Sequence, residues 1–176
     1  MKQTNRQSGY TLIELIVVIG IVIILLITAT SLFYTTLIAG GKTNSAEAVK
    51  QAGQYAMGQM SYLIYNSRKL TPNNEALTCA PNMVSIGIQN QDLATTILSA
   101  QTVAGNVRIA SNSGIYLTPG NMTVVSGPTF DCTLPGNGSP PTVQITFTLQ
   151  KGVVGVDKAR DIINIPFTTE VTLRNY

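Results

Sequence analysis

Apolar residues fill the chain from Tyr10 to about Ala39 and become periodic only after that stretch. No charged residue occurs from Leu15 to Gly41, a run of 27 positions. About 20 apolar residues suffice for a helix to span a bilayer, whereas the apolar core of a secretory signal has about 7–15. The run therefore predicts a membrane-spanning helix.

A second helical pattern follows Gly40-Gly41, which predicts a soft joint between two helical segments. Ser45 is expected to open the second segment, and Thr71-Pro72-Asn73-Asn74 is expected to close it. If the segments join, residues 11–68 form one helix of about 85 Å at 1.5 Å per residue. One face is marked by apolar and small residues at three- and four-residue spacing: Val49, Ala52, Gly53, Ala56, Met60, Leu63, Ile64 and Ser67.

Strand patterns replace the helical period after Asn74. Five segments alternate or are rich in β-branched residues, with Asn, Gly and Pro clusters between them: 84–88, 107–109, 122–124, 143–149 and 171–173. The clearest is 143–149, whose odd-numbered residues are all apolar, and residues 135–141 are expected to form an exposed loop. The expected fold class is α+β: a long N-terminal α-helix with a transmembrane first half, whose second half packs on a mainly antiparallel β-sheet.

The charges change this picture little. Only 11% of the residues are charged, and the net charge is +3. Lys2 and Arg6 supply two of the positive charges, and no Lys/Arg cluster remains in the rest of the chain, so nucleic-acid binding is not expected. The same two residues precede the apolar run, which predicts a cytoplasmic N-terminus.

The chain has no histidine and two cysteines, Cys79 and Cys132. This composition opposes a Cys/His zinc site and any His-based catalytic triad, and no metal or cofactor is expected. Two cysteines in a chain that crosses a membrane are read as one disulfide formed outside the cytoplasm. The alternative is a pair of buried free thiols.

The segment from Gly9 to Ile19 reads GYTLIELIVVI and carries the identification. It resembles the prepilin leader and methylation signature of type IV pilins and type II secretion pseudopilins, with the usual Phe replaced by Tyr10. The resemblance implies that an inner-membrane prepilin peptidase cuts between Gly9 and Tyr10 and then N-methylates Tyr10. It also implies that Glu14 pairs with the free amine of a neighbouring subunit and so directs assembly.

Two of these residues also have a physical reason for their positions. A residue without a Cβ at Gly9 would let the peptidase approach the scissile bond closely. An ionisable group such as Glu14 within an apolar helix costs roughly 2.5–3.5 kcal/mol on insertion scales and is a functional candidate by default. The alternative is that Glu14 reaches the lipid head groups without any role in assembly.

The resemblance divides the chain into a leader (1–9), a transmembrane and filament-core helix (10–41) and a head of helix and sheet (42–176). Many major pilins have a helix-breaking Gly and Pro where this chain has Ile23 and Ser31. This departure favours a minor pilin or pseudopilin, and a major pilin that forms the filament shaft is the alternative. The implied partners are other pilin subunits, the prepilin peptidase, an inner-membrane assembly platform and, before assembly, the lipid bilayer.

An exported membrane-anchored enzyme is a third interpretation, which the missing catalytic motifs oppose. Ser113-Gly114 and Ser126-Gly127-Pro128 are read as turns. Asp157 and Asp161 are read as a solvated charged turn, with a calcium site as the alternative. The helix tyrosines are expected to pack in the core or the filament, with a ligand-binding stripe as the alternative: Tyr55, Tyr62 and Tyr65.

Overall fold

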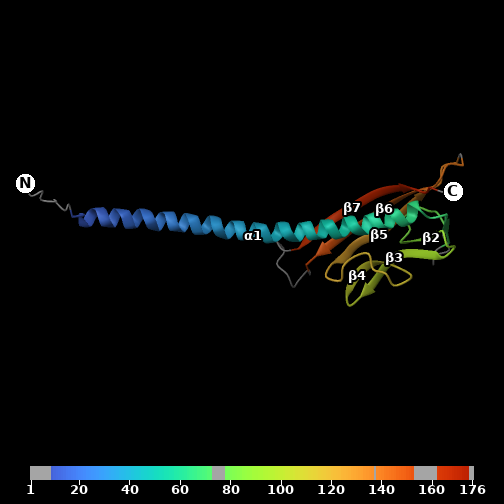
Figure 1. The fold of residues 1–176 in the computed structure, drawn as a ribbon, viewed down its shortest axis with the longest axis horizontal. Coiled ribbons are helices and arrows are strands. Elements are labelled where there is room, and N and C mark those ends of the chain that lie inside the picture. Colours follow the sequence, from blue (N-terminus) through green and yellow to red (C-terminus); the bar gives the residue numbers. More distant parts are fainter. Residues whose placement is uncertain (1–8, 73–77, 137, 153–161, 175–176) are drawn as a thin grey trace, which may run out of the picture. The chain divides into compact units, whose positions relative to one another are not determined.

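The structure is a computed structural model that describes residues 9–72, 78–136, 138–152 and 162–174. In these residues, a single helix precedes the strands (Figure 1): α1 (Leu12–Tyr65), β1 (Lys69–Thr71), β2 (Ser85–Gln89), β3 (Thr95–Val103), β4 (Asn106–Ser111), β5 (Thr123–Thr133), β6 (Thr142–Lys151) and β7 (Ile163–Thr172). The chain divides into two compact units, Met1–Gly41 and Lys42–Tyr176, and each is treated separately below.

The first unit consists of the apolar part of α1. Every described residue in it is exposed. The most apolar 18-residue window of α1 has a mean hydropathy of 3.1, and none of that window is buried. Helix α1 is thus long and apolar enough to cross a membrane, in agreement with the sequence pattern.

Helix α1 continues through Gly40-Gly41, so the two expected helical segments join into one helix, and Ser45 does not open a separate one. The boundary between the two compact units nevertheless falls at Gly41. Glycine in a helix interior costs only about 1 kcal/mol relative to alanine, which is too little to end a helix on its own. The helix also continues through Ile23 and Ser31. Near Ser31 the hydroxyls bond back to the helix, as shown by Thr28 Oγ1, which donates to the Leu25 carbonyl at 2.9 Å.

In the second unit, α1 buries the predicted face against the sheets. Its buried residues are Val49, Gly53, Ala56, Met60 and Ile64. The helix ends at Tyr65, where Ser67 Oγ donates to the Ile64 carbonyl at 2.7 Å. The expected closing segment therefore lies beyond the helix end, because Thr71 already belongs to β1; Asn73 and Asn74 are outside the described residues.

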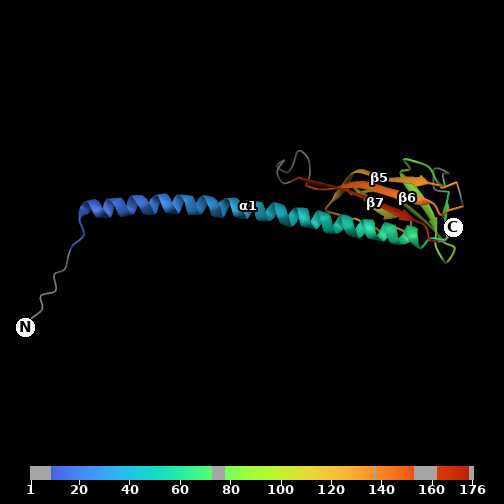
Figure 2. The same cartoon turned by 90° about the horizontal axis from the view of Figure 1, so that it is seen from above.

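The strands form two antiparallel sheets, whereas the sequence analysis expected one. The first sheet has the order β1-β2-β3-β4, the second has the order β5-β6-β7, and β4 contacts β5. Figure 2 shows β5, β6 and β7 on the same side of the second half of α1. The α+β class is confirmed, with the helix packed on antiparallel sheets.

Strand β6 confirms the clearest of the predicted strands. Its four inward residues are almost completely buried: Val143, Ile145, Phe147 and Leu149. The predicted segments 84–88 and 107–109 coincide with β2 and β4, whereas β1 and β3 were not predicted. Residues 122–124 and 171–173 mark only the start of β5 and the end of β7.

Ser126-Gly127-Pro128 lies inside β5 and is not the expected turn. The pairing of β5 with β6 shifts register between Val124 and Ser126 and again between Ser126 and Thr129, which marks a β-bulge. Gly127 has a φ of 83°, a left-handed conformation that glycine adopts without steric cost. Turn-type residues therefore serve here to bend a strand.

Strand β7 is the terminal strand of its sheet, and among the described strands it pairs only with β6. Exposed residues alternate with more buried ones along it, and the exposed set includes Pro166 and Glu170. Two hydroxyl pairs join it to β6: Thr142 lies 3.3 Å from Thr172, and Thr146 lies 3.4 Å from Thr168. The strand thus presents one face to solvent and one to the core.

Candidate processing and assembly site

The expected cleavage position lies just before α1. Gly9 and Tyr10 are outside any helix or strand, and both are exposed, Tyr10 by 86%. A Cβ built on Gly9 would meet no atom within 4 Å. The described part of the chain therefore leaves room for a side chain at position 9.

Helix α1 begins with an N-terminal cap that was not among the features predicted from the sequence. The backbone N–H of Glu14 donates to Thr11 Oγ1 at 3.4 Å, and the N–H of Leu15 donates to the Thr11 carbonyl at 3.3 Å. Thr11 is thus the N-cap, and Glu14 is the third helical residue. The spacing Thr-x-x-Glu is that of a capping box and could have been found in the sequence.

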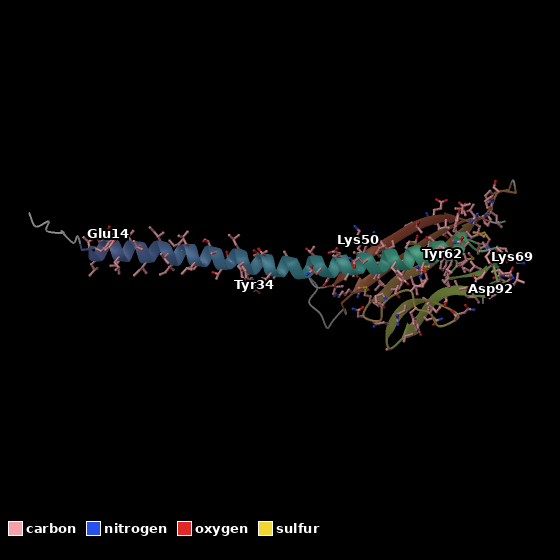
Figure 3. The ribbon with its side chains drawn as sticks, in the orientation of Figure 1. Glu14, Tyr34, Lys50, Tyr62, Lys69 and Asp92 are labelled. Carbon is pink, nitrogen blue, oxygen red and sulfur yellow. A yellow bond between two sulfur atoms is a disulfide. The ribbon has the colours of Figure 1, made fainter. Side chains whose placement is uncertain are left out.

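This position gives Glu14 a role in stabilising the start of α1, in addition to its predicted role in assembly. Its carboxylate lies in the first turn of α1, where the partial positive charge of the helix N-terminus favours an anion. The figure with side chains shows Glu14 at this end of the helix (Figure 3). Tyr10 and Glu14 lie along the same open groove of the helix surface as apolar side chains of the next helical turns.

The two cysteines are joined by a disulfide, as predicted. The Cα atoms of Cys79 and Cys132 are 5.1 Å apart. The N–H of Cys132 donates to the Ala80 carbonyl at 3.0 Å, and Met83 exchanges two backbone hydrogen bonds with Phe130. The disulfide therefore fastens the segment that precedes β2 to the end of β5.

The helix tyrosines do not belong to the core of the second unit. Tyr55, Tyr62 and Tyr65 are 60%, 65% and 47% exposed, so the expectation of core packing is wrong. Figure 3 shows Tyr62 on the second half of α1. These side chains are open to a partner, and their packing in a filament stays a prediction.

The remaining candidates give no further site. Ser113-Gly114 lies in a turn, as expected. Asp157 and Asp161 lie outside the described residues, so neither the charged turn nor the calcium site can be placed. Within the described parts of the chain, no three Asp, Glu, Cys or His side chains gather as metal ligands would.

Comparison with known proteins identifies the start of the chain. Residues 4–30 match the family described as the prokaryotic N-terminal methylation motif. This match contains the expected cleavage position, the N-cap and most of the uncharged run. No curated protein and no solved structure matches the chain.

Proposed function

We propose that this chain, type IV pilin-like by its N-terminal methylation motif, is a minor structural subunit of a type IV pilus-like filament. Prepilin peptidase cuts it after Gly9 and methylates the new amino group of Tyr10. The apolar part of α1 first holds the mature chain in the membrane. The same part of the helix then packs against other subunits in the filament.

The observation that carries this proposal is the exposure of that helix. Every described residue up to Gly41 is exposed, and no charge interrupts the run after Glu14. So large an apolar surface is unstable in water and requires a covering of lipid or protein. A subunit that moves from a bilayer to a helical bundle finds such a covering in both places.

The direction of insertion follows from the basic leader. Lys2 and Arg6 are retained on the cytoplasmic side of a bacterial inner membrane, so the second unit lies on the opposite side before assembly. The disulfide between Cys79 and Cys132 supports this orientation, because disulfides persist outside the reducing cytoplasm.

The minor role rests on the anchoring helix. Helix α1 continues without a break through Ile23 and Ser31. Many major pilins have a helix-breaking glycine and proline at the corresponding positions. A major shaft subunit is the second candidate, and the number of copies per filament separates the two. An exported enzyme has little support, because the segment from Gly9 to Ile19 resembles structural pilin subunits and the sequence has no recognisable catalytic motif.

The test is to shear filaments from cells and to measure the intact mass of this subunit in them. The expected chain begins at Tyr10 and carries one added methyl group. The number of copies of this chain in the sheared filaments is expected to be a small fraction of the number of shaft subunits. Assembled protein that still begins at Met1 would contradict processing, and recovery of the chain only as a membrane protein would contradict the filament role.

A further inference from the structure

We infer that Tyr34 marks the outer lipid–water interface while the subunit is held in the membrane, well before the uncharged run ends at Gly41. The inference rests on the proposed membrane-held stage and concerns only the first unit. Tyr34 and the turns of α1 that follow it then contact the lipid head groups.

The apolar run, which begins before Glu14, is too long to lie within the hydrocarbon core. The 28 positions of α1 from Leu12 to Ala39 correspond to about 42 Å of helix, against a hydrocarbon thickness of about 30 Å. To bury all of them, the helix would have to tilt by roughly 44°, whereas membrane helices tilt by about 20° on average and up to about 40°. Part of the run therefore lies outside the hydrocarbon.

Two tyrosines have the separation that the bilayer requires. Tyr10 and Tyr34 are 86% and 64% exposed, so both rings are open to lipid. Helix α1 spans about 33 Å from its first residue, Leu12, to Tyr34, and Tyr10 lies two residues before that start, so the two rings bracket a length close to the hydrocarbon thickness of about 30 Å. Tyrosine concentrates at such interfaces because its ring is apolar and its hydroxyl is hydrated. Figure 3 shows Tyr34 on α1.

The hydroxyl groups between Tyr10 and Tyr34 satisfy their hydrogen bonds within the helix. Thr28 Oγ1 donates to the carbonyls of Ile24 and Leu25 at 3.2 and 2.9 Å, and Ser31 Oγ donates to the Thr28 carbonyl at 2.9 Å. Thr30 Oγ1 donates to the Leu26 carbonyl. These hydroxyls therefore need no water in the hydrocarbon. Glu14 lies in the first turn of α1, four residues after Tyr10 in the sequence, close enough to the inner interface to be hydrated.

The residues after Tyr34 suit the head-group layer better than the hydrocarbon. Thr35-Thr36 follow Tyr34 directly, and Gly40-Gly41 end the run. Between them lie only Leu37 and Ile38 as large apolar residues. The uncharged run thus ends with about 10 Å of helix on the outer side of the proposed boundary.

The experiment measures the depth of single sites in lipid vesicles. The native cysteines form a disulfide, and no free cysteine is present among the described residues, so an introduced cysteine can be labelled alone. Full-length Val22→Cys, Leu32→Cys, Ile38→Cys and Lys42→Cys variants are labelled with a nitroxide and reconstituted in phosphatidylcholine vesicles. Collision rates with oxygen and with a water-soluble nickel chelate then report depth, because oxygen concentrates in hydrocarbon and the chelate stays in water.

The expected result is that oxygen collisions dominate at positions 22 and 32 and that nickel collisions dominate at positions 38 and 42. Tyr34→Leu, combined with Ile38→Cys, should reverse the ratio at position 38 in favour of oxygen. Phe33→Leu is the matched control: Phe33 is 68% exposed, close to the 64% of Tyr34, but has no hydroxyl, so this change should leave the ratio unaltered.

Two results would overturn the inference. If position 38 is as shielded from nickel as position 32, or if Tyr34→Leu changes nothing, Tyr34 does not set the boundary, while the membrane-held stage of the proposed function stands. If positions 22 and 32 are as open to nickel as position 42, the helix is not in the bilayer. That result would overturn both the inference and the membrane-held stage.

Discussion

Gly53 of helix α1 lies directly against the ring of Phe167 on strand β7. A Cβ built on Gly53 would be 2.0 Å from Phe167 Cζ, closer than any real contact. The Phe167 ring in turn stacks on Phe147 of β6, with ring centroids 5.2 Å apart. The absence of a side chain at position 53 thus sets how closely the helix approaches this sheet.

Gly53→Ala is therefore expected to destabilise the second unit, although alanine is the better helix former. Overpacking a filled core costs typically about 1–3 kcal/mol, which exceeds the roughly 1 kcal/mol gained in helix propensity. Thermal unfolding of the full-length protein in detergent, followed by near-ultraviolet circular dichroism, measures the difference.

Gly58→Ala is the matched control, because a Cβ at Gly58 meets no atom within 4 Å. This variant should unfold at the same temperature as the wild type or a few degrees higher. Equal effects of the two substitutions would show that the contact with Phe167 does not limit the approach of the helix.

Gly9→Leu is expected to leave the uncut precursor in the membrane. The fold has open space at position 9, so the substitution should not disturb the structure, and the loss would arise in the peptidase site. Immunoblots of membrane fractions would distinguish the two chain lengths. Gly20→Leu, at an equally open glycine within α1, should still be cut. Normal cleavage of Gly9→Leu would show that the scissile bond lies elsewhere.

Glu14→Val should be cut normally but should fail to enter filaments. Membrane insertion would not suffer, because the change removes a charge from the apolar segment. Assembly would suffer, because the free amine of Tyr10 would enter an apolar bundle without a partner, at a cost of several kcal/mol. Fractionation of cells into membrane and sheared filament gives the distribution of the processed chain.

Two further variants separate the charge of Glu14 from its place in the helix cap. Glu14→Gln keeps a capping-box side chain but loses the charge, and it should fail like Glu14→Val. Thr11→Val removes the hydroxyl that accepts the N–H of Glu14 at 3.4 Å, which costs helix stability of about 1 kcal/mol, and it should still assemble. Wild-type incorporation of Glu14→Gln would favour the alternative in which Glu14 only reaches the lipid head groups.

Reduction of the Cys79–Cys132 disulfide should lower the stability of the second unit. The two cysteines are 53 positions apart, and closing a loop of that size contributes about 4 kcal/mol in the chain-entropy model. Protein from the cell envelope should show no free thiol until it is reduced, and its unfolding temperature should then fall. Alkylation of both cysteines without reductant would show that the bond does not form in the cell.

The sequence predicted those elements whose buried faces repeat regularly. The face of α1 from Val49 to Ile64 and the alternation of β6 were both correct, because one side of each element packs on the core. Strand β3 was missed, since only Leu98 is fully buried in it and its half-buried positions include the polar Ser99 and Gln101, so the sequence shows no alternation of apolar and polar residues. Strand β5 was recognised only at its start, because the bulge at Gly127 has the composition of a turn.

The residues of the candidate site could be predicted from the sequence for a different reason. Gly9, Tyr10 and Glu14 were found through a contiguous motif that the peptidase and neighbouring subunits are expected to recognise, and this requires no knowledge of the fold. The N-cap at Thr11 was missed although its spacing was visible. The division of the strands into two sheets could not be predicted, because pairing depends on contacts between distant segments such as Met83 and Phe130.

Among the described strands, β7 leaves one edge without a partner, which would matter for a protein that assembles with copies of itself. A long unpaired edge strand is a template on which other chains can add strands and aggregate. Pro166 offers no N–H to an incoming strand, and Glu170 places a charge on the same exposed face. Both features are expected to hinder the addition of a further strand at β7, so that, if the proposed filament forms, its copies are expected to join through the helix and not through this sheet.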